Sequence, residues 1–172
     1  EDGFLVELAQ AQLVRQVFPE APIKYMPPTK HMTGNIFRGH IQDALFNMIA
    51  VTTGQTIQLL GMHTEAIHTP HMQDRYLSIE NASYIFNNMR HLGDEIQFKE
   101  GGIIQSRAHE VLESAAKMLE EIEEEGLFST IEHGKFAGVK RPMNGGKGLD
   151  GVSKKGDGYL NPFIELMLGG ER

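Results

Sequence analysis

The sequence predicts an α/β fold in which short parallel strands alternate with helices, and three observations lead to this prediction. A strand candidate followed by a helix occurs twice in succession, over residues 22–51 and 56–92. Proline or glycine bounds each strand candidate, and apolar residues recur at helical spacing after it. Two parallel strands cannot form a stable sheet alone, because such sheets are covered on both faces. We therefore expect residues 1–95 to be the end of a repeating βα array whose earlier units are missing from this chain or are supplied by another one.

The first βα unit follows a helix predicted over residues 4–17, where leucine and valine recur at helical spacing before Pro19. Residues 22–27 are the first strand candidate, bounded by proline at both ends. Asn35 is a suitable N-cap for a helix predicted over residues 36–51. Apolar residues at helical spacing in that helix are Ile36, Phe37, Ile41, Leu45, Met48 and Ile49.

The second βα unit begins after Gly54, with a strand candidate over residues 56–62. A long helix is predicted over residues 72–92, and Gly93 is expected to stop it. Asp74 lies near the N-terminus of this helix, where a negative charge is favourable to the helix dipole. The unit thus repeats the strand–loop–helix order of the first.

Residues 96–172 are expected to form a different, accessory segment that is helical and then rich in glycine. Strong helix formers predict a helix over residues 105–125, and its glutamate run at 120–125 is interpreted as a solvated face. A shorter segment follows to about residue 134. Glycine becomes dense from residue 135 onward, which predicts a loop-rich tail that packs over another part of the protein.

Composition excludes several classes of function. The chain has 16 basic and 23 acidic residues, a net charge of −7 that argues against binding to a nucleic-acid backbone. It has no cysteine, which excludes disulfides, thiolate metal sites and a thiol nucleophile, and fits a reducing cytoplasm. No apolar run could span a membrane. The chain begins at Glu1 without a signal-like segment, so we expect a mature fragment or a cleaved chain.

Ligands of parallel α/β folds lie beyond the carboxyl ends of the strands, which selects two loops, residues 26–35 and 62–71. Lys24 precedes the first loop, and if it points into the interior its charge needs a substrate carboxylate, a phosphate or an acidic neighbour. Alternatively, it extends outward into solvent. Lys30 is expected to face solvent or to bind an anion.

The second loop carries the other candidate groups. Glu65 could accept hydrogen bonds from a hydroxyl pair such as a ribose diol, or act as a base, although a carboxylate without a ligand is equally compatible. His63, His68 and His71 could suggest a metal-dependent hydrolase, but the glutamate of the zinc helix motif is missing. We rank that hypothesis last and expect histidines that form hydrogen bonds.

Four runs of the sequence carry a resemblance to a known family. They are PIKYMPPTKHMTGN at 22–35, GQTIQLLGMHTEAIHTPH at 54–71, QDRYLSIENA at 73–82 and KRPMNGGKGLDGV at 140–152. Together they resemble the C-terminal part of the large (alpha) subunits of the D-lysine 5,6-aminomutase and D-ornithine 4,5-aminomutase family. The resemblance covers nearly the whole chain. It implies that residues 1–95 are the last two βα units of a TIM-type (β/α)8 barrel.

The resemblance also implies a function and its partners. These enzymes use adenosylcobalamin and pyridoxal 5′-phosphate in a radical 1,2-amino shift that moves the terminal amino group of D-lysine or L-beta-lysine to C5. A Rossmann-like, cobalamin-binding beta subunit holds much of both cofactors and supplies the lysine that anchors pyridoxal phosphate. We expect a hetero-oligomer that contains that subunit and the remainder of the large subunit, so this chain alone should be inactive.

Carried onto this sequence, the resemblance places Lys24 and Lys30 at the substrate and Glu65 at the adenosyl ribose. His63 and Thr64 are weaker candidates for the same cofactor site, and no residue is assigned as catalytic. The Asp-x-His-x-x-Gly motif that ligates cobalamin is absent from the chain. A non-catalytic assembly fragment of such a complex remains the alternative, favoured by the incomplete sheet and the acidic final third. Preference for lysine or ornithine depends on one methylene, about 1–3 kcal/mol, and stays open.

Overall fold

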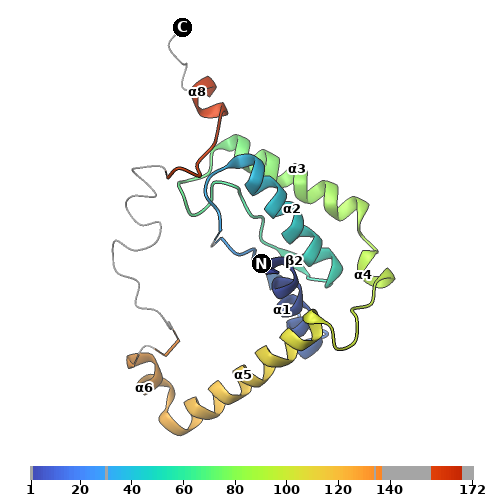
Figure 1. The fold of residues 1–172 in the computed structure, drawn as a ribbon, viewed down its shortest axis with the longest axis vertical. Coiled ribbons are helices and arrows are strands. Elements are labelled where there is room, and N and C mark those ends of the chain that lie inside the picture. Colours follow the sequence, from blue (N-terminus) through green and yellow to red (C-terminus); the bar gives the residue numbers. More distant parts are fainter. Residues whose placement is uncertain (1, 30, 134, 137–155, 168–172) are drawn as a thin grey trace.

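The computed structural model describes residues 2–29, 31–133, 135–136 and 156–167 (Figure 1). Helices alternate with two short strands in its first half, and helices alone form the rest. The elements are α1 Gly3–Val17, β1 Lys24–Tyr25, α2 Ile36–Thr52, β2 Ile57–Gln58, α3 Met72–Asn88, α4 Leu92–Glu95, α5 Ile103–Glu125, α6 Leu127–Glu132 and α8 Phe163–Met167. This order confirms the α/β prediction for residues 1–95.

The two strands form a parallel pair, with Lys24 opposite Ile57 and Tyr25 opposite Gln58. Each strand is shorter than its candidate run. Pro27 and the proline after it have no backbone N–H to donate, so the hydrogen-bonded ladder cannot continue along β1. The described residues form a two-stranded sheet, and they do not close a barrel.

The core lies where α1, α2 and β1 meet. Asn35 caps α2 as predicted, because its side-chain oxygen accepts a hydrogen bond from the backbone N–H of Arg38 at 3.1 Å. Helix α2 packs against α3, and α1 packs against both α2 and α5. The buried cluster consists of Leu8, Ala11, Tyr25, Ile49 and Ala50.

The buried face of α2 differs from the apolar stripe in its sequence. Phe37 and Ile41 are exposed, whereas the polar Asp43 and Asn47 are buried. The reason is that α3 and the loop before it present polar partners to α2: the Asn47 amide, for example, donates to Asn81 at 3.0 Å. The hydrophobic pattern alone therefore assigns part of the wrong face to the interior.

The prediction that Gly93 stops the long helix is wrong. Helix α3 ends at Asn88, whose side-chain amide donates to the backbone oxygen of Tyr84 at 2.7 Å, and Gly93 lies inside the short α4. A Cβ at residue 93 would overlap the backbone oxygen of Thr52. Glycine therefore serves the close approach of α4 to the end of α2.

Helix α5 extends away from the α2–α3 layer (Figure 1). None of its residues is buried, and residues 120, 121, 123 and 124 of the acidic run are exposed, which confirms the solvated face. Glu125 at its end pairs with Lys135 and with His133, whose Nδ1 lies 2.7 Å away. Within the described residues, no helix is both long and apolar enough to cross a bilayer. Most of the predicted glycine-dense tail, residues 137–155, falls outside the described residues.

Candidate functional site

Two loops follow the parallel strands: the first loop, residues 26–35, and the second loop, residues 62–71. Residues 156–161 of the tail cover the first loop. Thr33 Oγ1 donates to the backbone oxygen of Gly158 at 3.1 Å. The backbone N–H of Ile36 donates to the backbone oxygen of Leu160 at 2.9 Å. Gly34 has a positive φ of 84°, and a Cβ there would overlap the Tyr159 ring. The tail therefore fixes the first loop at the start of α2.

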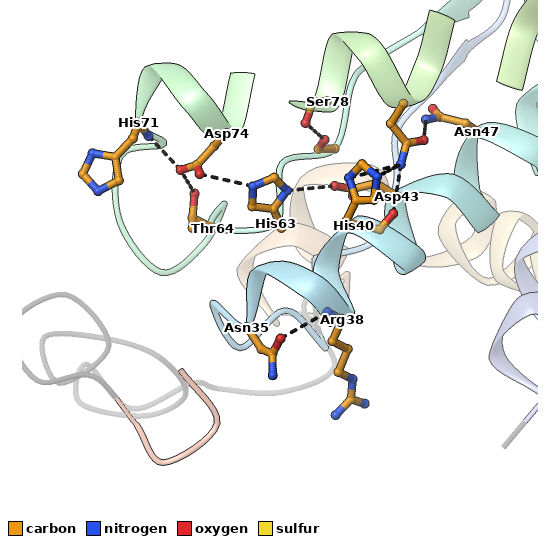
Figure 2. Close-up of polar contacts among 12 residues, drawn as sticks. Asn35, Arg38, His40, Asp43, Asn47, His63, Thr64, His71, Asp74 and Ser78 are labelled. Atoms are coloured by element: carbon orange, nitrogen blue, oxygen red, sulfur yellow. Dashed lines mark hydrogen bonds and ion pairs between the residues drawn. The ribbon is translucent and has the colours of Figure 1, made fainter. Parts of the chain in front are cut away.

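The second loop is held by one buried carboxylate, Asp74, in the first turn of α3 (Figure 2). Its Oδ2 accepts from Thr64 Oγ1 at 2.6 Å and from the backbone N–H of His71 at 2.8 Å, and its Oδ1 lies 3.2 Å from His63 Nε2. Burial acts to raise the pKa of Asp74, but these hydrogen bonds outweigh it, so the pKa lies below its usual value. Asp74 is therefore the ionised acceptor of the loop.

A second buried carboxylate, Asp43 on α2, lies on the other side of the same imidazole. Its Oδ2 is 3.9 Å from His63 Nδ1. Burial and then the charge of Glu65 raise the pKa of Asp43 to about 7. Burial also lowers the pKa of His63, more than its attraction to Asp74 raises it. Asp43 and His63 thus both favour their neutral forms.

Two glycines permit this close packing. A Cβ at Gly39 of α2 would overlap the Cβ of His63, and a Cβ at Gly61 would overlap Asp43 Oδ1. The backbone oxygen of Gly61 also accepts a hydrogen bond from Ser78 Oγ at 2.6 Å. Helix α2, the second loop and α3 are thereby brought together around His63.

An open depression of about 740 Å³ lies beside the second loop, lined by residues 66–69, His71, Tyr159 and Ile164. His68 Nδ1 lies 2.8 Å from the backbone oxygen of Thr69, which can only accept, so this nitrogen carries the proton. Its Nε2 then accepts from the Tyr159 hydroxyl at 3.1 Å. Among the described residues, no group of three or more His, Asp or Glu side chains is arranged so that it could hold a metal ion, so the hydrolase hypothesis gains no support there.

Comparisons with known proteins identify the family. Residues 1–166 match the family model described as the D-lysine 5,6-aminomutase TIM-barrel domain of the alpha subunit. The chain belongs to this family. It is 66% identical over its whole length to the lysine 5,6-aminomutase alpha subunit of Fusobacterium nucleatum subsp. nucleatum, and covers 33% of that protein. It is 67% identical over 98% of its length to the corresponding subunit of Acetoanaerobium sticklandii, and covers 32% of it.

A more distant relative is the D-ornithine 4,5-aminomutase subunit beta of Acetoanaerobium sticklandii, 25% identical over 91% of the chain and 23% of that protein. The chain thus spans about a third of the length of the alpha subunits that it matches. The names of these relatives make each of them one subunit of a larger enzyme. The match confirms the resemblance seen in the four sequence runs.

Within this aminomutase domain, the predicted substrate and cofactor residues occupy different environments. Lys24 is exposed on β1, whereas its neighbour Tyr25 faces the core, as strand alternation requires. Glu65 is half-buried in the second loop, near enough to Asp43 for its charge to raise the pKa there. Lys30 lies outside the described residues.

The weaker candidates lie deeper. His63 and Thr64 are both 0% exposed and contact Asp74, so they form the buried side of the second loop. Their assignment to cofactor binding stays a prediction, as do the roles of Lys24, Lys30 and Glu65.

Sequence reasoning missed Asp43, Gly39 and Gly61, and gave Asp74 only a role at the helix dipole. A signal for Asp43 exists in the sequence: Ile36, Gly39, Asp43 and Asn47 recur at spacings of three and four, and all are buried on one face of α2. An acidic residue in such a series indicates a buried polar partner. This spacing becomes apparent only when polar residues are counted together with apolar ones in the helical periodicity.

Proposed function

We propose that the complete protein is an adenosylcobalamin- and pyridoxal-phosphate-dependent aminomutase that moves the terminal amino group of D-lysine or L-beta-lysine to C5. This chain would supply two strand-end loops to its substrate and cofactor site. Family membership supports the reaction type. The single observation that carries the proposal for this chain is Glu65, half-buried between Thr64, which is bonded to the buried Asp74, and residues 66–69, which line an open depression. The cobalamin-binding beta subunit and the remainder of the large subunit are the proposed partners.

The carboxylate at the second loop, a hydrogen-bond acceptor, fits the adenosyl group of the cofactor. A carboxylate has two oxygens and only accepts hydrogen bonds, which suits the two adjacent hydroxyls of a ribose. When bound, adenosylcobalamin supplies an organic radical by cobalt–carbon homolysis, and pyridoxal phosphate carries the migrating amine. Glu65 would hold the ribose so that the radical carbon meets the substrate in a fixed orientation.

Lys24 is the proposed partner of the substrate carboxylate. Its side chain is exposed on β1, and no acidic group of the described residues lies within the 4 Å of an ion pair. An ammonium group binds a carboxylate or a phosphate as a point charge. Lys30 is proposed for the same anionic groups.

The buried residues at the second loop would serve the reaction by excluding water. His63 and Thr64 both contact the carboxylate of Asp74, and all three residues are 0% exposed. A substrate radical must be shielded from stray hydrogen donors, which favours a dry and rigid support over a mobile one.

Glu65→Gln tests the proposal. The full-length large subunit with this change, assembled with its partner, should lose about 10²-fold in kcat/KM, since Gln offers one acceptor where Glu offers two and misplaces the ribose. Cobalt–carbon cleavage after addition of D-lysine, followed by the absorbance of the cofactor, should fall in parallel. Glu80→Gln, an exposed position on α3, is the matched control. Equal activity of the two variants contradicts the role of Glu65.

Lys24→Met tests the substrate contact separately. Losing a hydrogen bond to a charged group costs about 1.5–3 kcal/mol, which should raise the KM for D-lysine by about 10- to 100-fold. Lys99→Met, at an exposed lysine beyond α4, is the control. An unchanged KM would place Lys24 among the outward-facing lysines.

Assembly is a second candidate role, and α5 favours it. Leu112 and Leu119 lie seven residues apart on one face of this helix and are 46% and 66% exposed. Replacing both with serine in the full-length subunit should weaken the complex with the partner, measured by analytical ultracentrifugation. Glu120→Ser, also exposed on α5, is the control. An unchanged sedimentation profile contradicts the assembly role.

A further inference from the structure

Three buried side chains from three elements form a line in which an imidazole separates two carboxylates (Figure 2). Asp43 comes from α2, His63 from the second loop and Asp74 from α3. Their exposed fractions are 2%, 0% and 0%. We call them the Asp43–His63–Asp74 unit. His63 Nε2 lies 3.2 Å from Asp74 Oδ1, and His63 Nδ1 lies 3.9 Å from Asp43 Oδ2.

The two ends of this line are satisfied differently. Asp74 accepts hydrogen bonds from Thr64 and from the backbone of His71 as well as from His63. Both side-chain oxygens of Asp43 are buried without a hydrogen-bond partner among the described residues. An ionised carboxylate buried without donors is far more costly than a protonated one.

One ring nitrogen of His63 is in the same condition as the Asp43 oxygens. His63 Nδ1 is also buried without a hydrogen-bond partner in the described part of the chain. Asp74 can only accept, so the imidazole proton resides on Nε2 and leaves a lone pair on Nδ1. The unpartnered acid of α2 thus faces an unpartnered base of the second loop.

We propose that Asp43 is a neutral carboxylic acid whose proton faces Nδ1 of His63, and that the Asp43–His63–Asp74 unit positions Glu65. The unit then holds two protons, one on Asp43 and one on His63 Nε2, and a single negative charge on Asp74. The positioning half of the inference rests on the proposed function, because it concerns the carboxylate assigned there to the adenosyl ribose.

The backbone explains how the unit acts on Glu65. His63 and Thr64, the two preceding residues, are both anchored to Asp74, and the N–H of Glu65 closes a turn on the backbone oxygen of Met62 at 2.8 Å. Glu65 therefore follows directly on a segment that Asp74 holds in place. Within the described part of the chain, no hydrogen bond occupies the Glu65 carboxylate, so none competes there with a ligand.

Charge makes the protonation of Asp43 part of the same arrangement. The titratable groups that face the unit are His40 on α2, whose ring centroid lies 6.4 Å from that of His63, Glu65 on the loop and Tyr159 of the tail, whose pKa the charge of Asp74 helps to raise. Burial and the charge of Glu65 raise the pKa of Asp43 to about 7. A neutral Asp43 leaves Glu65 as the single negative charge on that side of the imidazole.

Infrared spectroscopy of the full-length large subunit assembled with its partner tests the proton. The wild type should show the carbonyl band of a buried, protonated carboxyl group below pH 7, and Asp43→Asn should abolish it. Asp94→Asn is the matched control, because Asp94 also faces a histidine, His91 at 3.7 Å, but is 82% exposed. Persistence of the band in Asp43→Asn would overturn the proposal.

The same band reports the coupling to Glu65. Removing the charge in Glu65→Gln should move the titration midpoint of the band to lower pH, since that charge helps to raise the pKa of Asp43. Glu80→Gln should leave the midpoint unchanged. A midpoint that Glu65→Gln does not move contradicts the electrostatic link.

The positioning role needs a readout that simple destabilisation would not move. Asn has the shape of a neutral Asp, so Asp43→Asn should retain at least about tenfold more kcat/KM than Asp43→Ala, whose cavity lets the loop shift. Equal losses would overturn the role of the neutral acid. If Asp43→Ala does not assemble, the kcat/KM of Asp43→Asn relative to the wild type decides, because a loss of more than about 100-fold in the shape-preserving variant would overturn the positioning role.

The two proposals fail in different ways. An inactive Glu65→Gln enzyme together with no neutral-carboxyl band in the wild type would overturn this inference alone. A neutral-carboxyl band together with a fully active Glu65→Gln enzyme would overturn the proposed function and the positioning of Glu65, while the protonation of Asp43 would stand.

Discussion

The two strand-end loops are stabilised by different means. The first loop is held by a helix cap and by the tail: Asn35 caps α2, Thr33 Oγ1 donates to the backbone oxygen of Gly158, and the backbone N–H of Ile36 donates to the backbone oxygen of Leu160. The second loop is held by buried side chains, with His63 and Thr64 both on Asp74. Each loop begins at a short parallel strand and ends at a long helix, so the difference lies in the side chains and not in the topology.

Because of this difference, we expect the first loop to tolerate substitution and the second loop to fix the orientation of its side chains. Hydrogen bonds between backbone groups in partly exposed loops contribute about 0.5–1.5 kcal/mol each and tolerate side-chain change. A buried polar network has larger consequences when one member is removed, but it fixes side-chain orientation. We therefore expect the second loop to be the more sensitive to substitution, and it is the loop that carries Glu65.

The largest expected effect is that of Asp74→Ala. The change leaves His63, Thr64 and the backbone N–H of His71 without their acceptor, and removal of one partner from a buried charged network costs about 3–5 kcal/mol. Thermal and urea unfolding of the full-length subunit measure it. Asp94→Ala, at an exposed position, should change stability by less than about 0.5 kcal/mol. Similar losses in both variants would remove the distinction between the loops.

Gly39→Ala tests the packing that supports the second loop. The new Cβ would overlap His63 Cβ and come within 2.8 Å of its Cα, so backbone must move, and overpacking of this kind costs about 1–3 kcal/mol. Gly3→Ala is the matched control, since nothing lies within 4 Å of that position at the start of α1. The control should be neutral or stabilise the helix by up to about 1 kcal/mol. A tolerated Gly39→Ala would mean that α2 and the second loop are not in close contact.

The pH dependence of stability provides a further test of the buried pair Asp43 and His63. The folded chain raises the pKa of Asp43 to about 7 and lowers that of His63, whereas the unfolded chain titrates near 3.9 and 6.5. Between about pH 4 and 6.5 the titratable proton of the unfolded pair lies on His63, whereas the folded chain favours it on Asp43. The two contributions to the slope therefore have opposite signs and offset each other in the wild type.

Single substitutions should expose the two slopes with opposite signs. Asp43→Asn leaves the lowered pKa of His63, so stability should rise with pH up to about 6.5 and be lost as pH falls below it. His63→Gln leaves the raised pKa of Asp43, so stability should fall as pH rises from about 4 to 7. Each slope reaches at most about 1.4 kcal/mol per pH unit. Urea midpoints across this range measure it, and slopes of the same sign would contradict the pairing.

Local patterns made part of this structure predictable. The parallel βα order, the cap at Asn35 and the solvated acidic run on α5 each depend on residues close together in sequence. Proline boundaries and helical periodicity are sufficient to find such elements. The end of α3 was not predictable in this way, because glycine at residue 93 serves a contact with Thr52, about forty residues earlier, and not a helix stop.

The site was less predictable because its contacts join distant residues. Asp43 and Asp74 lie 31 positions apart and meet only through His63. Hydrophobic periodicity placed Phe37 and Ile41 among the inward-facing residues of α2, yet both are exposed while Asp43 is buried. A pattern that counts only apolar residues cannot recognise a face whose polar groups find partners on another element.

Asn35→Ala should have the smallest effect, because it removes one local device from the first loop. The backbone N–H of Arg38 loses its acceptor, and loss of an N-cap costs about 1 kcal/mol. The hydrogen bonds of Thr33 and Ile36 to the tail remain, so the loop should keep its conformation. Asn35→Asp preserves an acceptor oxygen and should preserve the stability of the subunit, measured by thermal unfolding. Equal losses in the two variants would show that Asn35 acts through its packing, and would bring the first loop closer in kind to the second.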